Sequence, residues 1–323
     1  MINALLEEKI KSSLNKHKII LHPNIKLAIN YSPQYSQTNQ FIKIMDINQN
    51  DYLIRINGKL WPPFTRKNES NHLKQIEKFK MNSNVIVNDE KNGFQICYFD
   101  NRNHNKTFST QFLKKIAITI KKYHSQLNFE NEYSVIETMT RSFSSLSPVN
   151  KKTLSAYYNI ILNLYCALAH DKDNFVASHN DLLPTSVFLK QDKVILVDWE
   201  YSGKAHRSYD LAFFSLKSGL TTSQENILID TYDSYDYFNL KKSVLLMKPI
   251  IAFLLLMWNA LSKSQHPISP DSLQSINHHL KDVTVNQSLR TLLSPNPFPF
   301  FKGARKKNNK IIRNSPMLAN QTL

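Results

Sequence analysis

The chain has 323 residues, of which 41% are hydrophobic and 20% charged, with 5 Gly and 13 Pro. These values are typical of a globular protein and exclude the disordered, fibrous and low-complexity classes, and the length allows more than one lobe. The formal net charge of +16 permits an anionic partner such as a nucleotide, a nucleic acid or a membrane surface, but the basic residues are spread along the chain, and we interpret most of them as solvated surface.

The first hundred residues are predicted to form a sheet with one inserted helix. Residues 1–20 repeat apolar side chains at helical spacing and carry no continuous apolar run of the kind found in secretory signals. Short apolar and β-branched runs bounded by polar turns predict strands, and a later amphipathic segment predicts a helix. The predicted strands are 42–44, 52–56, 85–87 and 94–99, and the inserted helix is 66–80.

The rest of the chain is predicted to be mostly helical, with a strand-rich stretch at 176–197. The predicted helices are 110–127, 153–170, 209–216, 223–235, 241–262 and 270–280. The most apolar run, 250–261, is shorter than the roughly 20 residues that a membrane span needs. We therefore interpret it as a buried core helix of a soluble, cytoplasmic protein without a membrane span.

Residues 286–323 are predicted to be a flexible basic tail. The segment is polar, proline alternates with phenylalanine at 295–301, and residues 304–313 read ARKKNNKIIR. Such a run can contact nucleic acid or anionic lipid, but the sequence shows no nucleic-acid-binding module, and we favour a solvated tail.

Two acidic residues on loops at strand ends, separated by a short hairpin, suggest an acid/base-plus-metal pair. Asp181 follows His179-Asn180 and precedes a turn at Leu183-Pro184, and Asp198 follows the hydrophobic strand 194–197. One carboxylate of such a pair can deprotonate a hydroxyl, and the other can hold Mg²⁺ against phosphate oxygens. Phosphoryl transfer needs little more than this positioning and charge neutralisation.

Three ordered motifs carry a resemblance to a known family. They are HNDLLPTS at 179–186, VDWEY at 197–201 and DLAFFS at 210–215. Together they resemble the choline kinase and aminoglycoside phosphotransferase family, with the best match to the bacterial LicA-type choline kinases. The resemblance implies an α+β, two-lobed protein-kinase-like fold. We expect a nucleotide-binding small lobe at 1–97, a catalytic and acceptor-binding large lobe at 98–285, and the tail at 286–323.

The family resemblance extends into the first sixty residues and nominates groups that hold ATP. Ser36, Thr38 and Asn39 match the turn that covers the phosphates, and Arg55 in YLIRING matches the strand residue that contacts them. Glu69 in RKNE matches the helical acid that pairs with that basic residue. A guanidinium held by a carboxylate is fixed for phosphate contact. The alternatives are an exposed strand charge for Arg55 and a helix-dipole contact for Glu69.

The same resemblance implies roles around the reaction itself. Asp181 is expected to be the catalytic base, and His179 is expected to brace its loop. Asp198 is expected to ligate Mg²⁺, and Asp210 to stabilise the loop from behind. Ser186 stands where the family has a metal-binding asparagine, and a serine hydroxyl is a shorter ligand.

The acceptor is expected to be a small cationic alcohol, with choline as the first choice. Trp199, Glu200, Tyr201 and Trp258 supply the aromatic faces and the carboxylate that a quaternary ammonium requires. Trp258 lies in an apolar helix, where a core position is the alternative. Thiamine, ethanolamine and aminoglycosides remain alternative acceptors, since a fold does not decide its substrate.

Two departures from the family pattern leave a second class of function open. One is Ser186, and the other is Ser36, which stands where a glycine is expected in the phosphate-covering turn. Without glycine, the backbone approaches phosphate less easily. The alternative is a protein that keeps the fold and binds ligands without catalysis.

Overall fold

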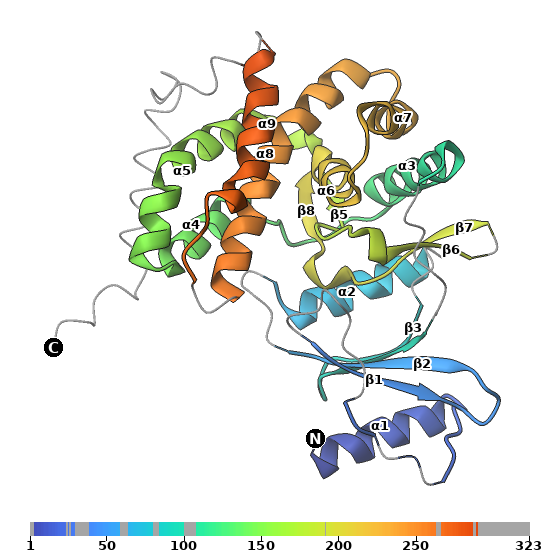
Figure 1. Cartoon of the computed structure of the whole chain (residues 1–323). Coiled ribbons are helices and arrows are strands. Elements are labelled where there is room, and N and C mark those ends of the chain that lie inside the picture. The colour runs from blue at the N-terminus through green and yellow to red at the C-terminus, as the bar shows by residue number, and fades with distance from the viewer. Residues whose placement is uncertain are drawn as a thin grey trace, which may run out of the picture.

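The computed structural model describes residues 3–23, 25, 27–29, 39–58, 64–79, 84–99, 108–190, 192–262, 266–286 and 289. Two lobes are visible in Figure 1, one built on a sheet and a larger one built mostly of helices. This arrangement is the predicted two-lobed α+β fold. Ser36, Thr38 and nearly all of the predicted tail lie outside the described residues.

The small lobe is an antiparallel sheet covered on one face by a helix. In the described part its strand order is β1-β2-β4-β3. Helix α1 packs on the sheet through Ile10 and Leu14, which share a core cluster with Ile42 and Ile54. The elements are α1 (Ala4–Lys16), β1 (Gln40–Met45), β2 (Asp51–Ile56), β3 (Val85–Asp89) and β4 (Phe94–Tyr98), which confirms the predicted helix and strands with small shifts at their ends.

Helix α2 (Arg66–Lys78) belongs to the large lobe by its packing, although its sequence lies between the strands of the small one. Figure 1 shows it between the sheet and the large lobe. Its apolar residues Leu73 and Ile76 are part of the large-lobe core cluster. His72 also stacks on Phe129, and its Nδ1 lies 2.7 Å from Ser202 Oγ. The sheet and α2 therefore contribute their buried apolar residues to two different core clusters.

The large lobe packs its helices around α8, with two short antiparallel strand pairs at the side facing α2 (Figure 1). Strand β5 pairs with β8, and β6 pairs with β7. The elements are α3 (Thr110–Gln126), α4 (Val135–Ser145), α5 (Pro148–Leu168), β5 (Phe175–Ser178), β6 (Val187–Lys190), β7 (Lys193–Leu196), β8 (Gly203–His206), α6 (Ser208–Ser218), α7 (Thr222–Tyr232), α8 (Tyr237–Ser262) and α9 (Gln274–Val285).

The predicted large-lobe helices are confirmed, with one omission and with shifts of up to five residues at their ends. Helix α4 was not predicted, because its serines and threonines have weak helical preference and its apolar face is short. Helix α5 begins at Pro148 rather than residue 153. The Ser147 Oγ accepts the backbone N–H of Asn150, and a proline at the first helical position favours this start.

Helix α8 is the described helix that is long and apolar enough to cross a membrane by length and composition. However, 67% of its most apolar stretch is buried inside the protein. Its neighbours are α4, α5, α6, α7 and α9. The helix therefore occupies the position predicted for the apolar run 250–261, as a core element of the large lobe.

The docking of α2 can be tested through its stability contribution. Ile76→Ala removes a fully buried side chain, and we expect it to lower the free energy of unfolding by about 2–5 kcal/mol, because the cavity adds to the lost burial. Ile118→Ala on α3 is the matched control, since Ile118 is 58% exposed, and its effect should stay within about 0.5 kcal/mol. Urea unfolding followed by circular dichroism measures both. Equal effects would contradict the packing of α2.

Candidate active site

The loop that carries Asp181 is held by the buried carboxylate of Asp210. This carboxylate accepts the backbone N–H of His179 at 2.8 Å and that of Asn180 at 2.8 Å. It also accepts the hydroxyl of Tyr123, and His124 Nε2 lies 3.1 Å away. Burial raises the pKa of Asp210, but these donors outweigh it and leave the pKa below its ordinary value. Asp210 is therefore an ionised anchor at the start of α6.

The same loop is bonded to the segment that carries Asp198. The His179 Nε2 lies 2.9 Å from the carbonyl of Val197, and burial lowers the pKa of His179, so the ring is neutral and donates this bond. Asn180 has a left-handed backbone with a φ of 64°. Its side-chain amide donates to the carbonyls of Tyr201 and Gly203. Direct hydrogen bonds therefore join the loop that carries Asp181 to the segment that carries Asp198.

Asp181 is half-buried, and its pKa lies well above the ordinary value of an aspartate. Burial, and then the charge of Glu200, raise its pKa to about 7, although Lys217 opposes the shift. A carboxylate whose pKa lies near the working pH is suited to accepting a proton from a hydroxyl. The geometry thus gives Asp181 the properties of a general base.

Asp198 is the carboxylate in this region that reaches solvent. Its side chain is 43% exposed, and one oxygen lies 3.7 Å from an Arg55 nitrogen. Asp198 has a left-handed backbone with φ 70° and ψ 56°, at the start of the 3₁₀ helix η3 (Trp199–Tyr201). Burial and the charge of Glu200 raise its pKa. A partly exposed carboxylate repelled by a like charge fits a divalent cation as its partner.

Ser186 lies next to the Asp198 segment. It ends the 3₁₀ turn η2 (Pro184–Ser186), and its carbonyl accepts the N–H of Val197 at 3.1 Å. Ser186 is buried. Asp198 and Ser186 offer one carboxylate and one hydroxyl, and these ligand types are compatible with Mg²⁺.

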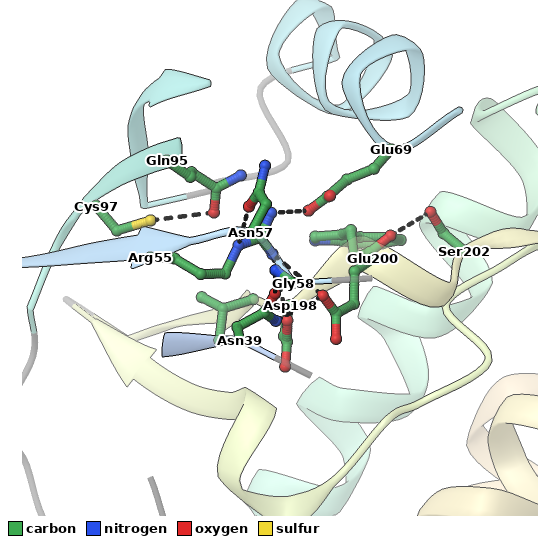
Figure 2. A network of polar contacts seen from close by, with 12 residues as sticks. Asn39, Arg55, Asn57, Gly58, Glu69, Gln95, Cys97, Asp198, Glu200 and Ser202 are labelled. Atoms are coloured by element: carbon green, nitrogen blue, oxygen red, sulfur yellow. Dashed lines mark hydrogen bonds and ion pairs between the residues drawn. The ribbon is translucent and has the colours of Figure 1, made fainter. Parts of the chain in front are cut away.

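Arg55 and Glu69 form a buried ion pair between β2 and α2, as Figure 2 shows. The guanidinium Nη2 donates to Glu69 Oε1 at 2.6 Å, and Nε donates to Asn57 Oδ1 at 3.0 Å. The other terminal nitrogen faces Asp198 and lies 3.6 Å from Glu200 Oε2. Neither alternative considered for these residues, an exposed strand charge or a simple helix-dipole contact, agrees with this geometry.

Arg66 is a charged residue of this region that the sequence analysis did not single out. Its Nη1 donates to Glu69 Oε2 at 2.9 Å and to Glu200 Oε2 at 2.8 Å. Its Nη2 donates to Asn39 Oδ1 at 2.7 Å and to the Gly58 carbonyl at 3.1 Å. The sequence did contain a signal for Arg66, because this residue opens the RKNE motif three residues before Glu69.

Glu200 differs from its expected position. It was expected to face the acceptor, but its side chain is buried and its Oε2 accepts from Arg66 and from the Asn39 amide at 2.8 Å. Burial raises the pKa of Glu200, but Arg55 and Arg66 outweigh it, so the pKa is lowered. The structure therefore directs this carboxylate oxygen toward the small lobe. Asn39, expected at the nucleotide, is part of the same contact.

A continuous run of aromatic rings includes two of the residues that were expected to bind the acceptor. The ring of Phe64 lies 4.9 Å from that of Tyr201 and 5.2 Å from that of Tyr133. Tyr201 meets Trp258 at 6.0 Å, and Tyr133 meets Tyr209 at 5.3 Å. Burial raises the pKa of Tyr133 and of Tyr209, and the charge of Asp181 adds to both shifts. The run joins two expected residues, Tyr201 and Trp258, to three that sequence reasoning missed.

Trp199 was expected at the acceptor, and this expectation is wrong. The side chain is 2% exposed, and its indole N–H donates to the Leu196 carbonyl at 3.2 Å. Its ring packs edge-on against Tyr123 and Phe129. Trp199 is therefore a core residue under the site. Its motif alone could not reveal this, because neighbours on a 3₁₀ helix point in different directions.

Comparisons with known proteins agree on one family. The family model described as choline/ethanolamine kinase matches residues 34–239. A LicA homolog from Metamycoplasma hominis is 26% identical over 227 residues, covering 69% of this chain and 81% of its own. The choline kinase LicA from Streptococcus pneumoniae has a TM-score of 0.66 at 18% identity, covering 86% of this chain and 98% of its own. The aminoglycoside phosphotransferase APH(2'')-Ib has a TM-score of 0.55 at 12% identity, covering 87% and 97%.

The anchoring contact of Asp210 leads to a stability prediction. Asp210→Asn replaces an acceptor of two backbone N–H groups by an amide that presents donors of its own. We expect a loss of about 3–5 kcal/mol in the free energy of unfolding, because buried donors lose their charged partner. Asp230→Asn, at an exposed position on α7, is the matched control and should change little. Denaturant unfolding of both variants measures the difference. A loss below about 1 kcal/mol for Asp210→Asn would contradict an anchoring role.

Proposed function

Since this chain belongs to the choline/ethanolamine kinase family, we propose that it transfers the γ-phosphoryl group of ATP to the hydroxyl of choline, with Mg²⁺ bound. Family membership makes the chain an ATP-dependent phosphotransferase with a small alcohol acceptor. The choice of choline, the metal and the roles of single residues are the proposal. The observation that carries it is the run of aromatic rings, which extends from Trp258 and Tyr201 through Phe64 to Tyr133 and Tyr209, the two tyrosines on which the charge of Asp181 acts.

The reaction requires a base beside the acceptor hydroxyl. Asp181 takes the proton as the acceptor oxygen attacks the γ-phosphorus, and the bond from phosphorus to the bridging oxygen of ADP breaks. The pKa of about 7 supports this role, because the base form is present at neutral pH and can still accept a proton. His179 and Asp210 hold the loop in place during the transfer.

The nucleotide side is assigned to Arg55 and the groups near it. Glu69 fixes the Arg55 guanidinium, so that it can contact phosphate oxygens without reorganising. Asp198 and Ser186 would hold Mg²⁺, which supplies positive charge to the phosphate oxygens. Asn39 is assigned to the phosphates as well, and Ser36 and Thr38, which were predicted there, lie outside the described residues.

The acceptor side favours a quaternary ammonium. Such a group cannot donate hydrogen bonds, and aromatic faces bind it by cation–π attraction worth about 0.5–2 kcal/mol per favourable ring. Phe64, Tyr201 and Trp258 supply those faces. The Glu200 oxygen that could receive hydrogen bonds from a primary amine already accepts two. This arrangement favours choline over ethanolamine and over amine-rich aminoglycosides.

A soluble, cytoplasmic location is part of the same proposal. The apolar helix α8 is mostly buried among the other helices of the large lobe, which supports a core position rather than a membrane one.

The first experiment measures ADP formation with Mg·ATP across a panel of choline, ethanolamine, thiamine and an aminoglycoside. We expect choline to give the highest kcat/KM, and Asp181→Asn to lower it by at least about 100-fold while ATP still binds, because the proton acceptor is lost. For the wild type, kcat/KM should rise as pH increases through about 7, since the deprotonated carboxylate is the active form. Nucleotide binding without turnover on any acceptor would favour the non-catalytic alternative.

The aromatic run is tested at Trp258, which is half-buried on α8. Trp258→Ala should raise the KM for choline by about tenfold, because one cation–π face and its contact with Tyr201 are lost. The KM for ATP should stay within about twofold. Steady-state kinetics, with the melting temperature as a control for folding, separates the outcomes. A lower melting temperature with an unchanged choline KM would place Trp258 in the core.

A further inference from the structure

Arg66 joins four separate segments of the chain at the boundary of the two lobes. It opens α2, and its two terminal nitrogens contact Asn39 before β1, Gly58 after β2, Glu69 on α2 and Glu200 on η3. Figure 2 shows Asn39, Gly58 and Glu200 gathered in this region below Glu69. A planar guanidinium presents several donors in a fixed fork, and here the fork places a positive charge against Glu200.

The contact with Arg66 holds the Glu200 carboxylate on the side of η3 that faces the small lobe. Glu200 is the residue before Tyr201, whose ring touches Phe64 and Trp258. It is also near enough to Asp181 to raise the pKa of that carboxyl. Rotation of Glu200 away from the small lobe would therefore bring a negative charge toward the groups that surround the acceptor.

The restraint has an electrostatic basis. Among the residues described in this network, the acids Glu69, Asp198 and Glu200 face the bases Arg55 and Arg66. Removing Arg66 leaves Arg55 as the base of this network for all three acids. A buried carboxylate that loses its cation is strongly driven to find another. A primary ammonium, with three N–H donors, is such a cation, whereas a quaternary ammonium has no donor.

We propose that Arg66 is a positioning residue that sets acceptor specificity, because it keeps Glu200 bonded to the small lobe and so reserves the acceptor site for a quaternary ammonium. Primary ammonium alcohols are then disfavoured, since they lose water without gaining a carboxylate. The inference rests on the proposed function, because it assumes that the aromatic run binds the cationic end of the acceptor.

The test compares choline with ethanolamine at saturating Mg·ATP. Arg66→Gln should lower the ratio of kcat/KM for choline to that for ethanolamine by about tenfold, because the freed Glu200 accepts from the primary ammonium. Arg66→Lys keeps the cation beside Glu200 and should hold the ratio within about threefold of wild type. Arg66→Gln combined with Glu200→Gln should restore the wild-type preference, since the carboxylate that bound ethanolamine is gone. Arg141→Gln, at an exposed helical pair, is the control.

A purely structural role predicts a different result. It would lower the melting temperature and both kcat/KM values together, with an unchanged ratio in Arg66→Gln, and this would overturn the inference. If Arg66→Gln does not fold, Asn39→Ala removes the second donor to Glu200 and should shift the ratio in the same direction by about twofold. An unchanged ratio in that variant would also overturn it.

Binding measurements separate this inference from the proposed function. If the wild type turns over neither alcohol, the reaction assignment fails. The dissociation constants of choline and ethanolamine, measured by titration calorimetry with Mg²⁺ and a non-hydrolysable ATP analogue, still test Arg66. A ratio of the two constants that moves toward ethanolamine in Arg66→Gln would support the positioning role without turnover, and an unmoved ratio would reject it.

Discussion

The buried carboxylate of Asp210 is the contact on which the geometry of the site depends. By accepting the N–H groups of two consecutive residues, it fixes the backbone just before Asp181. This fixed backbone allows Asn180 to hold a left-handed conformation and to bond the carbonyls of the 201–203 segment. A single ionised group in the core thus sets the positions of the two loops that carry the candidate base and the candidate metal ligand. Polar networks of this kind specify one geometry because a partly satisfied alternative is costly.

The second constraint is the attachment of α2 to the large lobe. Apolar contacts of Leu73 and Ile76 and the bond from His72 to Ser202 hold the helix there, independently of the sheet. The ion pair from Glu69 to Arg55 then connects the sheet to this fixed helix. Besides an apolar contact of Val85, the sheet is therefore joined to the large lobe and α2 by charged and polar contacts, whereas α2 meets the large lobe through apolar burial. Charged contacts can exchange for phosphate and metal at lower cost than a packed core can rearrange.

The sequence predicted the fold class and most elements, because long periodic helices and motif-bearing strands leave clear patterns. The ordered motifs and their family resemblance predicted that Asp181, Asp198, Arg55 and Glu69 belong to one site. Trp199 and Glu200 were misplaced for a definite reason. These residues and Tyr201 form a 3₁₀ turn with three residues per revolution, so consecutive side chains point about 120° apart. Trp199 enters the core, Glu200 faces the small lobe and Tyr201 joins the aromatic run. Only the surrounding packing decides which side chain takes which direction.

The aromatic run shows why the acceptor side could not be read from one motif. Phe64 comes from the residues before α2, Tyr133 from the segment before α4, Tyr201 from η3, and Trp258 from α8. No two of these lie within 50 positions of each other, so their proximity is a product of tertiary structure. Phe64 precedes α2, which is docked on the large lobe, and Tyr201 points about 120° away from Glu200 on the same short helix. The aromatic run and the attachment of the two lobes thus share the region around α2.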